Sequence, residues 1–158
     1  MPVLTVDEAG TFVEAQRNAR KKIVFTNGVF DLLHVGHTRY LRTARQLGGT
    51  LLVGVNSDSS VRRLGKGDGR PVTPETERAE LLASLAFVDA VVIFDEDTPE
   101  KLIARLLPDI LVKGSDWKDR ENPGRKLIED RGGTMVFVPL EGGYSTTSIL
   151  ERIKKSRG

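Results

Sequence analysis

Short apolar runs that alternate with amphipathic segments constrain the fold of this chain more than any other feature of its sequence. The runs lie at residues 23–25, 50–55, 88–94, 110–112 and 134–139. Each run has the length of a strand, and segments with helical periodicity separate them. Continuous apolar runs are typical of parallel strands that are covered on both faces. The alternation therefore predicts an α/β fold with a doubly wound, mostly parallel sheet and helices on both faces.

The N-terminal segment precedes this alternation. Thr5 and Glu8 have the spacing of a capping box, and a polar, amphipathic stretch follows as far as about Arg20. We expect a helical extension at residues 1–21 that packs outside a core at residues 22–158. Because neither a linker nor an internal repeat interrupts the sequence, a single domain over residues 1–158 is predicted.

The composition excludes several classes of function. The formal net charge is only +2, which indicates no general polyanion-binding surface, so no nucleic-acid partner is expected. The absence of cysteine excludes disulfides, thiolate nucleophiles and cysteine-ligated zinc. The N-terminus lacks the pattern of a signal peptide, and no apolar run has membrane-spanning length. We expect a cytoplasmic protein that does not bind membranes.

The stretch that follows the first apolar run contains two histidines, the only ones in the chain. Asn27-Gly28 marks a turn, and an apolar-periodic segment from residue 32 to 47 predicts a helix. His34 and His37 lie three positions apart near the start of that helix, so both imidazoles project from one face. Gly36 between them allows a ligand to approach the backbone closely. Since helix N-termini bind phosphate, the stretch predicts a phosphate site.

Three further polar clusters follow predicted strands, at residues 56–58, 113–117 and 143–147. The C-terminal ends of parallel strands share one edge of the sheet, so these clusters should converge on the histidines. Lys113 directly follows an apolar strand, which favours a phosphate contact. The hydroxyl groups from Tyr144 to Thr147 fit either an ordinary helix cap or a second phosphate-binding helix start. Residues 56–58 likewise fit either a cap or a ligand contact.

A basic, glycine-rich segment, residues 65–74, is here called the flap. Lys66 and Arg70 alternate with glycines in it, which predicts a mobile segment that closes over anions. Arg63 precedes the flap and Arg78 follows it on a predicted helix. Arg78 is expected either to pair with a nearby glutamate or to reach a substrate phosphate.

These residues support a resemblance to a known superfamily. The segment TNGVFDLLHVGH resembles the signature of the HxGH nucleotidyltransferases, which include cytidylyltransferases and adenylyltransferases. In that superfamily the two histidines contact the triphosphate of a nucleoside triphosphate. The resemblance implies a Rossmann-like sheet of five strands in the order 3-2-1-4-5.

A closer resemblance covers nearly all of residues 24–153. The segments VGVNSDSSVRRL, PDILVKGSDW and EGGYSTTSILERI are similar to the adenylyltransferase domain family of ADP-heptose synthesis. The resemblance implies transfer of AMP from ATP to D-glycero-β-D-manno-heptose 1-phosphate, for lipopolysaccharide inner-core assembly. It also implies Mg²⁺ that arrives with ATP and has no protein ligands. Because no sugar-kinase segment accompanies the domain here, we expect the stand-alone form, for which the resemblance allows a homodimer.

Carried over residue by residue, the resemblance implies three groups of site residues. The catalytic group is His34, His37 and Lys113. The nucleotide-binding group is Thr26, Asn27, Gly28, Phe30, Asp31, Gly36, Gly114, Asp116, Tyr144, Ser145, Thr146 and Thr147. The group for the acceptor's phosphate or sugar is Asn56, Asp58, Arg63, Lys66, Arg70 and Arg78. Glu141 is assigned no role, because the family usually has its carboxylate one position later.

Other interpretations remain open from the sequence. Glycerol-3-phosphate cytidylyltransferases share the HxGH motif, a segment like Ser115-Asp116-Trp117 and the serine-threonine turn. The absence of an arginine in Leu140-Glu141-Gly142 favours the heptose enzymes over them. Synthesis of FAD or another dinucleotide, and a nucleotide sensor without catalysis, are the remaining alternatives.

Overall fold

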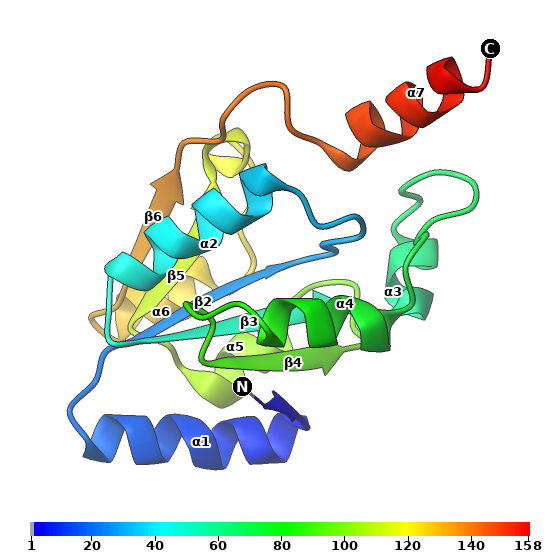
Figure 1. The fold of residues 1–158 in the computed structure, drawn as a ribbon. Coiled ribbons are helices and arrows are strands. Elements are labelled where there is room, and N and C mark those ends of the chain that lie inside the picture. The colour runs from blue at the N-terminus through cyan, green and yellow to red at the C-terminus, as the bar shows by residue number, and fades with distance from the viewer. Residues whose placement is uncertain (1) are drawn as a thin grey trace.

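Residues 2–158, which the computed structural model describes, form a six-stranded sheet between two layers of helices (Figure 1). The strands are β1 (Val3–Leu4), β2 (Ile23–Gly28), β3 (Thr50–Asn56), β4 (Ala90–Phe94), β5 (Ile110–Gly114) and β6 (Thr134–Val138). Their spatial order is β1-β4-β3-β2-β5-β6, and every pair of neighbouring strands is parallel.

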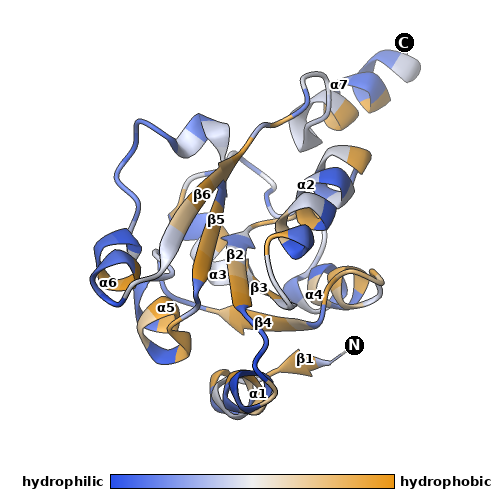
Figure 2. Cartoon of the chain, turned by 90° about the vertical axis from the view of Figure 1, so that its left-hand side faces the viewer, coloured by the Kyte–Doolittle hydropathy of each residue, from blue (hydrophilic) through white to orange (hydrophobic). Residues whose placement is uncertain are grey.

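The helices cover both faces of this sheet (Figure 2). They are α1 (Val6–Asn18), α2 (Val35–Gln46), α3 (Asp58–Arg63), α4 (Glu75–Ala83), α5 (Glu100–Leu106), α6 (Arg125–Asp130) and α7 (Thr146–Ser156), with a short 3-10 turn, η1 (Ser115–Trp117). Helices α2 and α4 pack on one face, and α1, α5 and α6 pack on the other. The predicted doubly wound α/β architecture is confirmed.

The predicted strand order is confirmed, whereas the predicted number of strands is wrong. The five predicted strands correspond to β2 to β6, and they lie in the predicted 3-2-1-4-5 order. The sixth strand, β1, pairs with β4 through Val3 and Leu4 at the edge of the sheet. A two-residue strand is too short to show a periodic pattern, so the N-terminal extension was expected to be helical only. The rest of the extension is helix α1, whose capping box of Thr5 and Glu8 is present as predicted.

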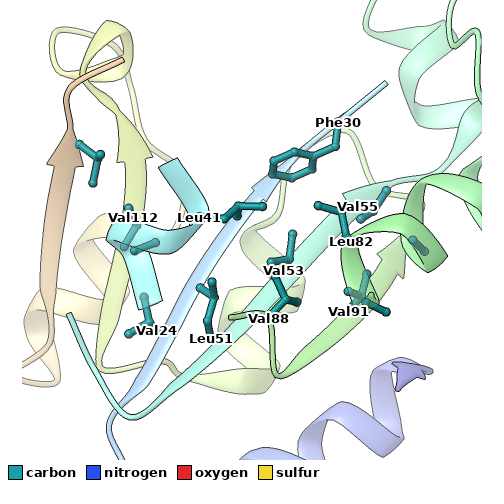
Figure 3. Packing of buried hydrophobic residues seen from close by; sticks show 14 residues of the cluster. Val24, Phe30, Leu41, Leu51, Val53, Val55, Leu82, Val88, Val91 and Val112 are labelled. Carbon is teal, nitrogen blue, oxygen red and sulfur yellow. The ribbon is translucent and has the colours of Figure 1, made fainter. Parts of the chain in front are cut away.

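Two apolar clusters form the core, one on each face of the sheet. Successive strand residues point to opposite faces, so Val24 packs under α2 while Ile23 and Phe25 pack against the other helix layer. Figure 3 shows the first cluster, in which Leu41 of α2 meets the valines of the central strands. All seven residues of β3 are buried. This packing makes the sheet and α2 a firm support for the turns at the C-terminal edge.

Helix α2 ends where it must approach β2 closely. A Cβ atom at Gly48 would lie 2.6 Å from a side-chain carbon of Val24, so only glycine fits there. Together with the burial of Leu41 and Ala44, this contact fixes α2 against β2. The histidines at the other end of α2 are thereby held at a fixed distance from the end of the strand.

Helix α7 differs from the other helices. Figure 1 shows it extending away from the body of the protein, and none of its residues is buried. The segment that leads into α7 nevertheless lies beside the start of α2, because a Cβ atom at Gly36 would come within 2.9 Å of Tyr144. None of the helices within residues 2–158 combines the length and the apolar character needed to cross a membrane.

Candidate active site

A pocket of about 580 Å³ opens at the C-terminal ends of β2 and β5. These two strands are neighbours, and the chain passes from β2 to β3 on one side and reaches β5 on the other. Such a reversal of strand order is where open α/β sheets bind ligands. Fourteen of the predicted site residues line this pocket: Asn27, Gly28, Phe30, His34, Gly36, His37, Lys66, Lys113, Gly114, Asp116, Tyr144, Ser145, Thr146 and Thr147.

The two histidines cap helix α2 reciprocally. The backbone N–H of His37 donates to Nδ1 of His34, and the backbone N–H of His34 donates to Nδ1 of His37, both at 3.4 Å. This is the geometry of a capping box, with imidazoles in place of the usual hydroxyl and carboxylate. The rings stack with their centroids 3.8 Å apart. One local motif thus starts the helix and orients both side chains.

The capping bonds also determine which ring nitrogens can serve a ligand. An Nδ1 atom that accepts a hydrogen bond carries no proton, so the proton of each neutral imidazole lies on Nε2. Burial, and secondarily the neighbouring His34, lower the pKa of His37 to about 4. Burial also lowers the pKa of His34. At neutral pH the pair therefore offers two neutral Nε2–H donors beside a helix N-terminus, which suits phosphate oxygens.

Two neighbours hold the histidine pair in place. Phe30 packs the edge of its ring against His37, with centroids 5.2 Å apart, and its own backbone is left-handed, with φ at +50°. That conformation is unfavourable for a bulky residue, so the burial of Phe30 in the core must offset it. A Cβ atom at Gly36 would lie 2.9 Å from Tyr144 and 3.0 Å from the His34 ring. Glycine alone therefore lets α7 begin next to α2.

Lys113 supplies a positive charge to the floor of the pocket. Its side chain is nearly buried, its ammonium group donates to Asn27 at 2.6 Å, and it lies 4.9 Å from the centre of the Trp117 ring. Burial lowers the pKa of Lys113 to about 8, while Asp116 acts in the opposite direction. The ammonium form therefore still predominates at neutral pH, and an anion in the pocket would favour it further, so Lys113 is suited to bind phosphate.

A second helix start, that of α7, also lines the pocket. Ser145 caps α7 with its hydroxyl, which accepts the backbone N–H of Ser148 at 3.0 Å. The first N–H groups of a helix have no partner within the helix, so those of Thr146 and Thr147 can bind an anion. An ion pair between Arg39 of α2 and Glu141 fastens the segment that leads into α7. The pocket is therefore lined by the N-termini of two helices, α2 and α7.

Seven predicted site residues lie outside the pocket lining: Thr26, Asn56, Asp31, Asp58, Arg63, Arg70 and Arg78. Thr26 and Asn56 are buried, and the Asn56 amide donates to Ser60 at 3.0 Å. Arg63 forms an exposed ion pair with Asp97 at 2.7 Å. Of the flap's basic residues, Lys66 faces the pocket, whereas Arg70 pairs with the buried carboxylate of Asp31.

Asp31 and Arg78 connect the flap to the loop between β2 and His34. The Asp31 carboxylate accepts the backbone N–H groups of Val72 and Thr73 at 2.8 and 2.9 Å. The Arg78 guanidinium is 1% exposed and donates to three acceptors: the Val29 carbonyl at 2.6 Å, the Thr73 carbonyl at 2.9 Å and the Asp58 carboxylate at 2.7 Å. Because these donors are occupied and buried, Arg78 acts as a structural crosslink in this structure.

Five residues that were not predicted also line the pocket: Val29, Tyr40, Trp117, Leu140 and Glu141. Tyr40 packs against the apolar cluster under α2, a position that a pattern of buried residues also explains, so it carried no distinct signal. Trp117 is recognisable from its place in the cluster at residues 113–117, directly after a strand. Glu141 was discounted because of its shifted position, yet its pairing with Arg39 brings it to the rim.

Comparisons with known proteins agree with this geometry. A family model described as cytidylyltransferase-like matches residues 25–152. The bifunctional protein HldE of Syntrophotalea carbinolica is 54% identical over 141 residues, which cover 89% of this chain and 29% of that protein. HldE of Escherichia coli is 49% identical over 155 residues, covering 98% of this chain and 32% of that protein. The chain thus spans about a third of the length of these curated relatives.

A solved structure gives the same picture. The lipopolysaccharide core biosynthesis protein from Thermoplasma volcanium shares 34% sequence identity with this chain and superposes with a TM-score of 0.64. The match covers 77% of this chain and 97% of that protein. The likeness therefore extends over most of the fold that carries the pocket.

Replacement of Arg78 should be costly for stability. Arg78→Lys keeps the charge, but one ammonium group cannot serve the three acceptors that the guanidinium holds. We expect a loss of about 3 kcal/mol in the free energy of unfolding, measured by urea denaturation. Arg63→Lys, at a half-exposed ion pair, is the matched control and should change it by less than about 1 kcal/mol. Equal effects of the two substitutions would contradict the crosslink.

The histidine pair makes stability depend on pH in a defined direction. The pKa of His37 is about 4 in the folded chain and 6.5 in the unfolded chain, so the unfolded state binds the proton first as pH falls. The neutral His37 ring therefore contributes fully to the free energy of unfolding above pH 6.5. This contribution, up to about 3 kcal/mol, is lost as the pH falls from 6.5 to 4. In NMR titrations of the two histidine rings, one ring should titrate near pH 4. Two rings that both titrate near 6.5 would contradict the buried, neutral pair.

Proposed function

This chain belongs to the cytidylyltransferase-like family, and from that premise we propose that it transfers AMP from ATP to D-glycero-β-D-manno-heptose 1-phosphate. The products are ADP-heptose and pyrophosphate. The observation that carries the proposal is the reciprocally capped pair of His34 and His37, whose two Nε2–H groups meet Lys113 and a second helix start in one pocket. The pocket combines donors that suit a triphosphate.

The proposed reaction explains the composition of the pocket. A phosphate oxygen of the acceptor attacks the α-phosphorus of ATP, and the bond from that phosphorus to the bridging oxygen of the β-phosphate breaks. The electron pair of that bond leaves with pyrophosphate. Because the attacking phosphate is already ionised, no general base is required. The enzyme has to hold two anions in line and stabilise charge on the phosphoryl groups. Imidazole, lysine and helix N–H donors can do both.

Each part of the pocket has a proposed role in this step. His34 and His37 donate to the triphosphate, and Lys113 neutralises charge that develops beside the α-phosphate. The N–H groups of Thr146 and Thr147, at the start of α7, also bind phosphate. Lys66 reaches the pocket from the flap, which makes it the residue proposed to draw the two phosphates together.

A divalent cation is proposed to enter as part of the ATP substrate. Within residues 2–158, no three His, Asp or Glu side chains converge to form a metal site. The pocket offers Asp116 and Glu141 as separate carboxylates, and Glu141 is already paired with Arg39. Mg²⁺ keeps most of its water and is commonly held by substrate phosphates, so this donor set fits a cation carried by ATP.

The acceptor is proposed from resemblance. The chain's motifs are similar to those of heptose 1-phosphate adenylyltransferases over nearly all of residues 24–153. The similar protein from Thermoplasma volcanium is named for lipopolysaccharide core biosynthesis, which supports a sugar phosphate acceptor here. The cytidylyltransferase-like description of the family keeps CTP with glycerol 3-phosphate as the second candidate pair.

Pyrophosphate release tests the proposal. The purified chain should be assayed with Mg²⁺, with ATP or CTP crossed against heptose 1-phosphate or glycerol 3-phosphate. We expect release only with ATP and the heptose phosphate. Release only with CTP and glycerol 3-phosphate would retain the proposed mechanism but contradict the proposed substrates. Binding of ATP without release in any combination would contradict the enzymatic proposal and favour a nucleotide sensor.

A further inference from the structure

Tyr40 occupies an unassigned position in the pocket. It follows His37 on α2 by three residues, so the Tyr40 side chain lies next to that of His37 on the helix surface. Its ring packs against the apolar cluster that α2 shares with the sheet, while part of the residue lines the pocket. An aromatic ring held by the core presents its hydroxyl group at a fixed place.

The hydroxyl of Tyr40 has one partner within the described chain, the hydroxyl of Thr26. The two oxygens are 2.7 Å apart, and the distance alone allows either group to be the donor. Two hydroxyl groups carry two hydrogens, and their mutual bond uses only one of them. The direction of this bond decides which hydrogen is left over.

The burial of Thr26 determines which of the two hydroxyl groups donates. Thr26 is 0% exposed, and its hydroxyl forms no other hydrogen bond among residues 2–158. If Tyr40 were the donor, the Thr26 hydrogen would be buried without an acceptor, a penalty that disfavours the arrangement by roughly fivefold to a hundredfold. Thr26 is therefore the donor and Tyr40 the acceptor. The phenolic hydrogen of Tyr40, a residue that lines the pocket, is then left without an acceptor among residues 2–158.

We propose that Tyr40 is a further ligand-contacting residue, whose phenolic O–H donates a hydrogen bond to an oxygen atom of the bound nucleotide. The inference rests on the proposed function, because that function places a nucleotide in this pocket. The acceptor is an oxygen of the phosphates or of the ribose, since both groups present acceptors to such a donor. Burial raises the pKa of Tyr40, which keeps the phenol protonated at neutral pH and able to donate.

Calorimetric titration of the full chain with Mg²⁺-ATP tests the proposal. Tyr40→Phe removes only the hydroxyl group and should weaken ATP binding about tenfold. Thr26 was predicted to bind nucleotide, but it is fully buried and lies outside the pocket lining, so it cannot contact the ligand directly. Thr26→Val leaves the phenolic hydrogen in place and should alter ATP affinity by less than about threefold. A parallel titration with tripolyphosphate identifies the acceptor. A contact to phosphate weakens both ligands in Tyr40→Phe, and a contact to ribose weakens ATP alone.

The double variant Thr26→Val/Tyr40→Phe separates binding from structure. Tyr40→Phe leaves the Thr26 hydroxyl without a partner and should lower the melting temperature by a few degrees. Removing both hydroxyl groups eliminates that buried orphan, so the melting temperature should recover while ATP affinity stays low. Recovery of affinity together with the melting temperature would mean that Tyr40 acts only through structure, and this would overturn the proposal.

Two further outcomes distinguish this inference from the proposed function. If Tyr40→Phe binds ATP as tightly as the natural chain, the ligand contact is wrong, whatever the turnover. If the natural chain binds ATP but releases no pyrophosphate, the proposed function is wrong, and the affinities of the variants still decide the role of Tyr40. A chain that binds neither ATP nor tripolyphosphate overturns both.

Discussion

The reciprocal capping of α2 by His34 and His37 is the interaction on which the site depends. A usual capping box serves the helix alone, with a hydroxyl and a carboxylate that are consumed by the capping bonds. An imidazole has a second nitrogen, so each histidine can satisfy a backbone N–H with Nδ1 and still offer Nε2–H to a ligand. The rigid sheet and the buried residues of α2 then fix where these two donors point.

The charges around the pocket fall into two groups with different consequences. Lys113 and Lys66 face the pocket, and their charges can be neutralised by a phosphate. Asp31 and Arg78 are nearly inaccessible and already have several partners each, so they join the flap to the loop before the histidines. A buried charge whose partners are all in place resists rearrangement, because the loss of one partner leaves part of that charge uncompensated in the interior. The site thus combines charges that face the pocket and can bind substrate with buried, paired charges that stabilise the surrounding loops.

The sequence predicted most of the frame and much of the pocket, for reasons that lie in particular residues. Five strands were recognisable as continuous apolar runs, whereas β1 has only Val3 and Leu4 and gains its pairing from the edge of β4. The histidine motif was recognisable because its spacing and its position after a strand are local properties. For Arg78, the sequence could not distinguish a structural role from a substrate-binding role, because its three acceptors lie in other segments of the chain. Tyr40 was missed because its ring packs against the core, so that its position has the same pattern as a purely apolar residue.

A crystal structure of the chain with Mg²⁺ and a slowly reacting ATP analogue would decide whether the helix cap and the nucleotide site are one motif. We predict that the phosphates lie within hydrogen-bond distance of Nε2 of both His34 and His37, and that the Lys113 ammonium group contacts the α-phosphate. The Nδ1 atoms should keep their capping bonds to the backbone. A triphosphate bound away from the start of α2, or histidine rings that abandon the cap to reach it, would contradict the conclusion that one motif both starts the helix and binds the nucleotide.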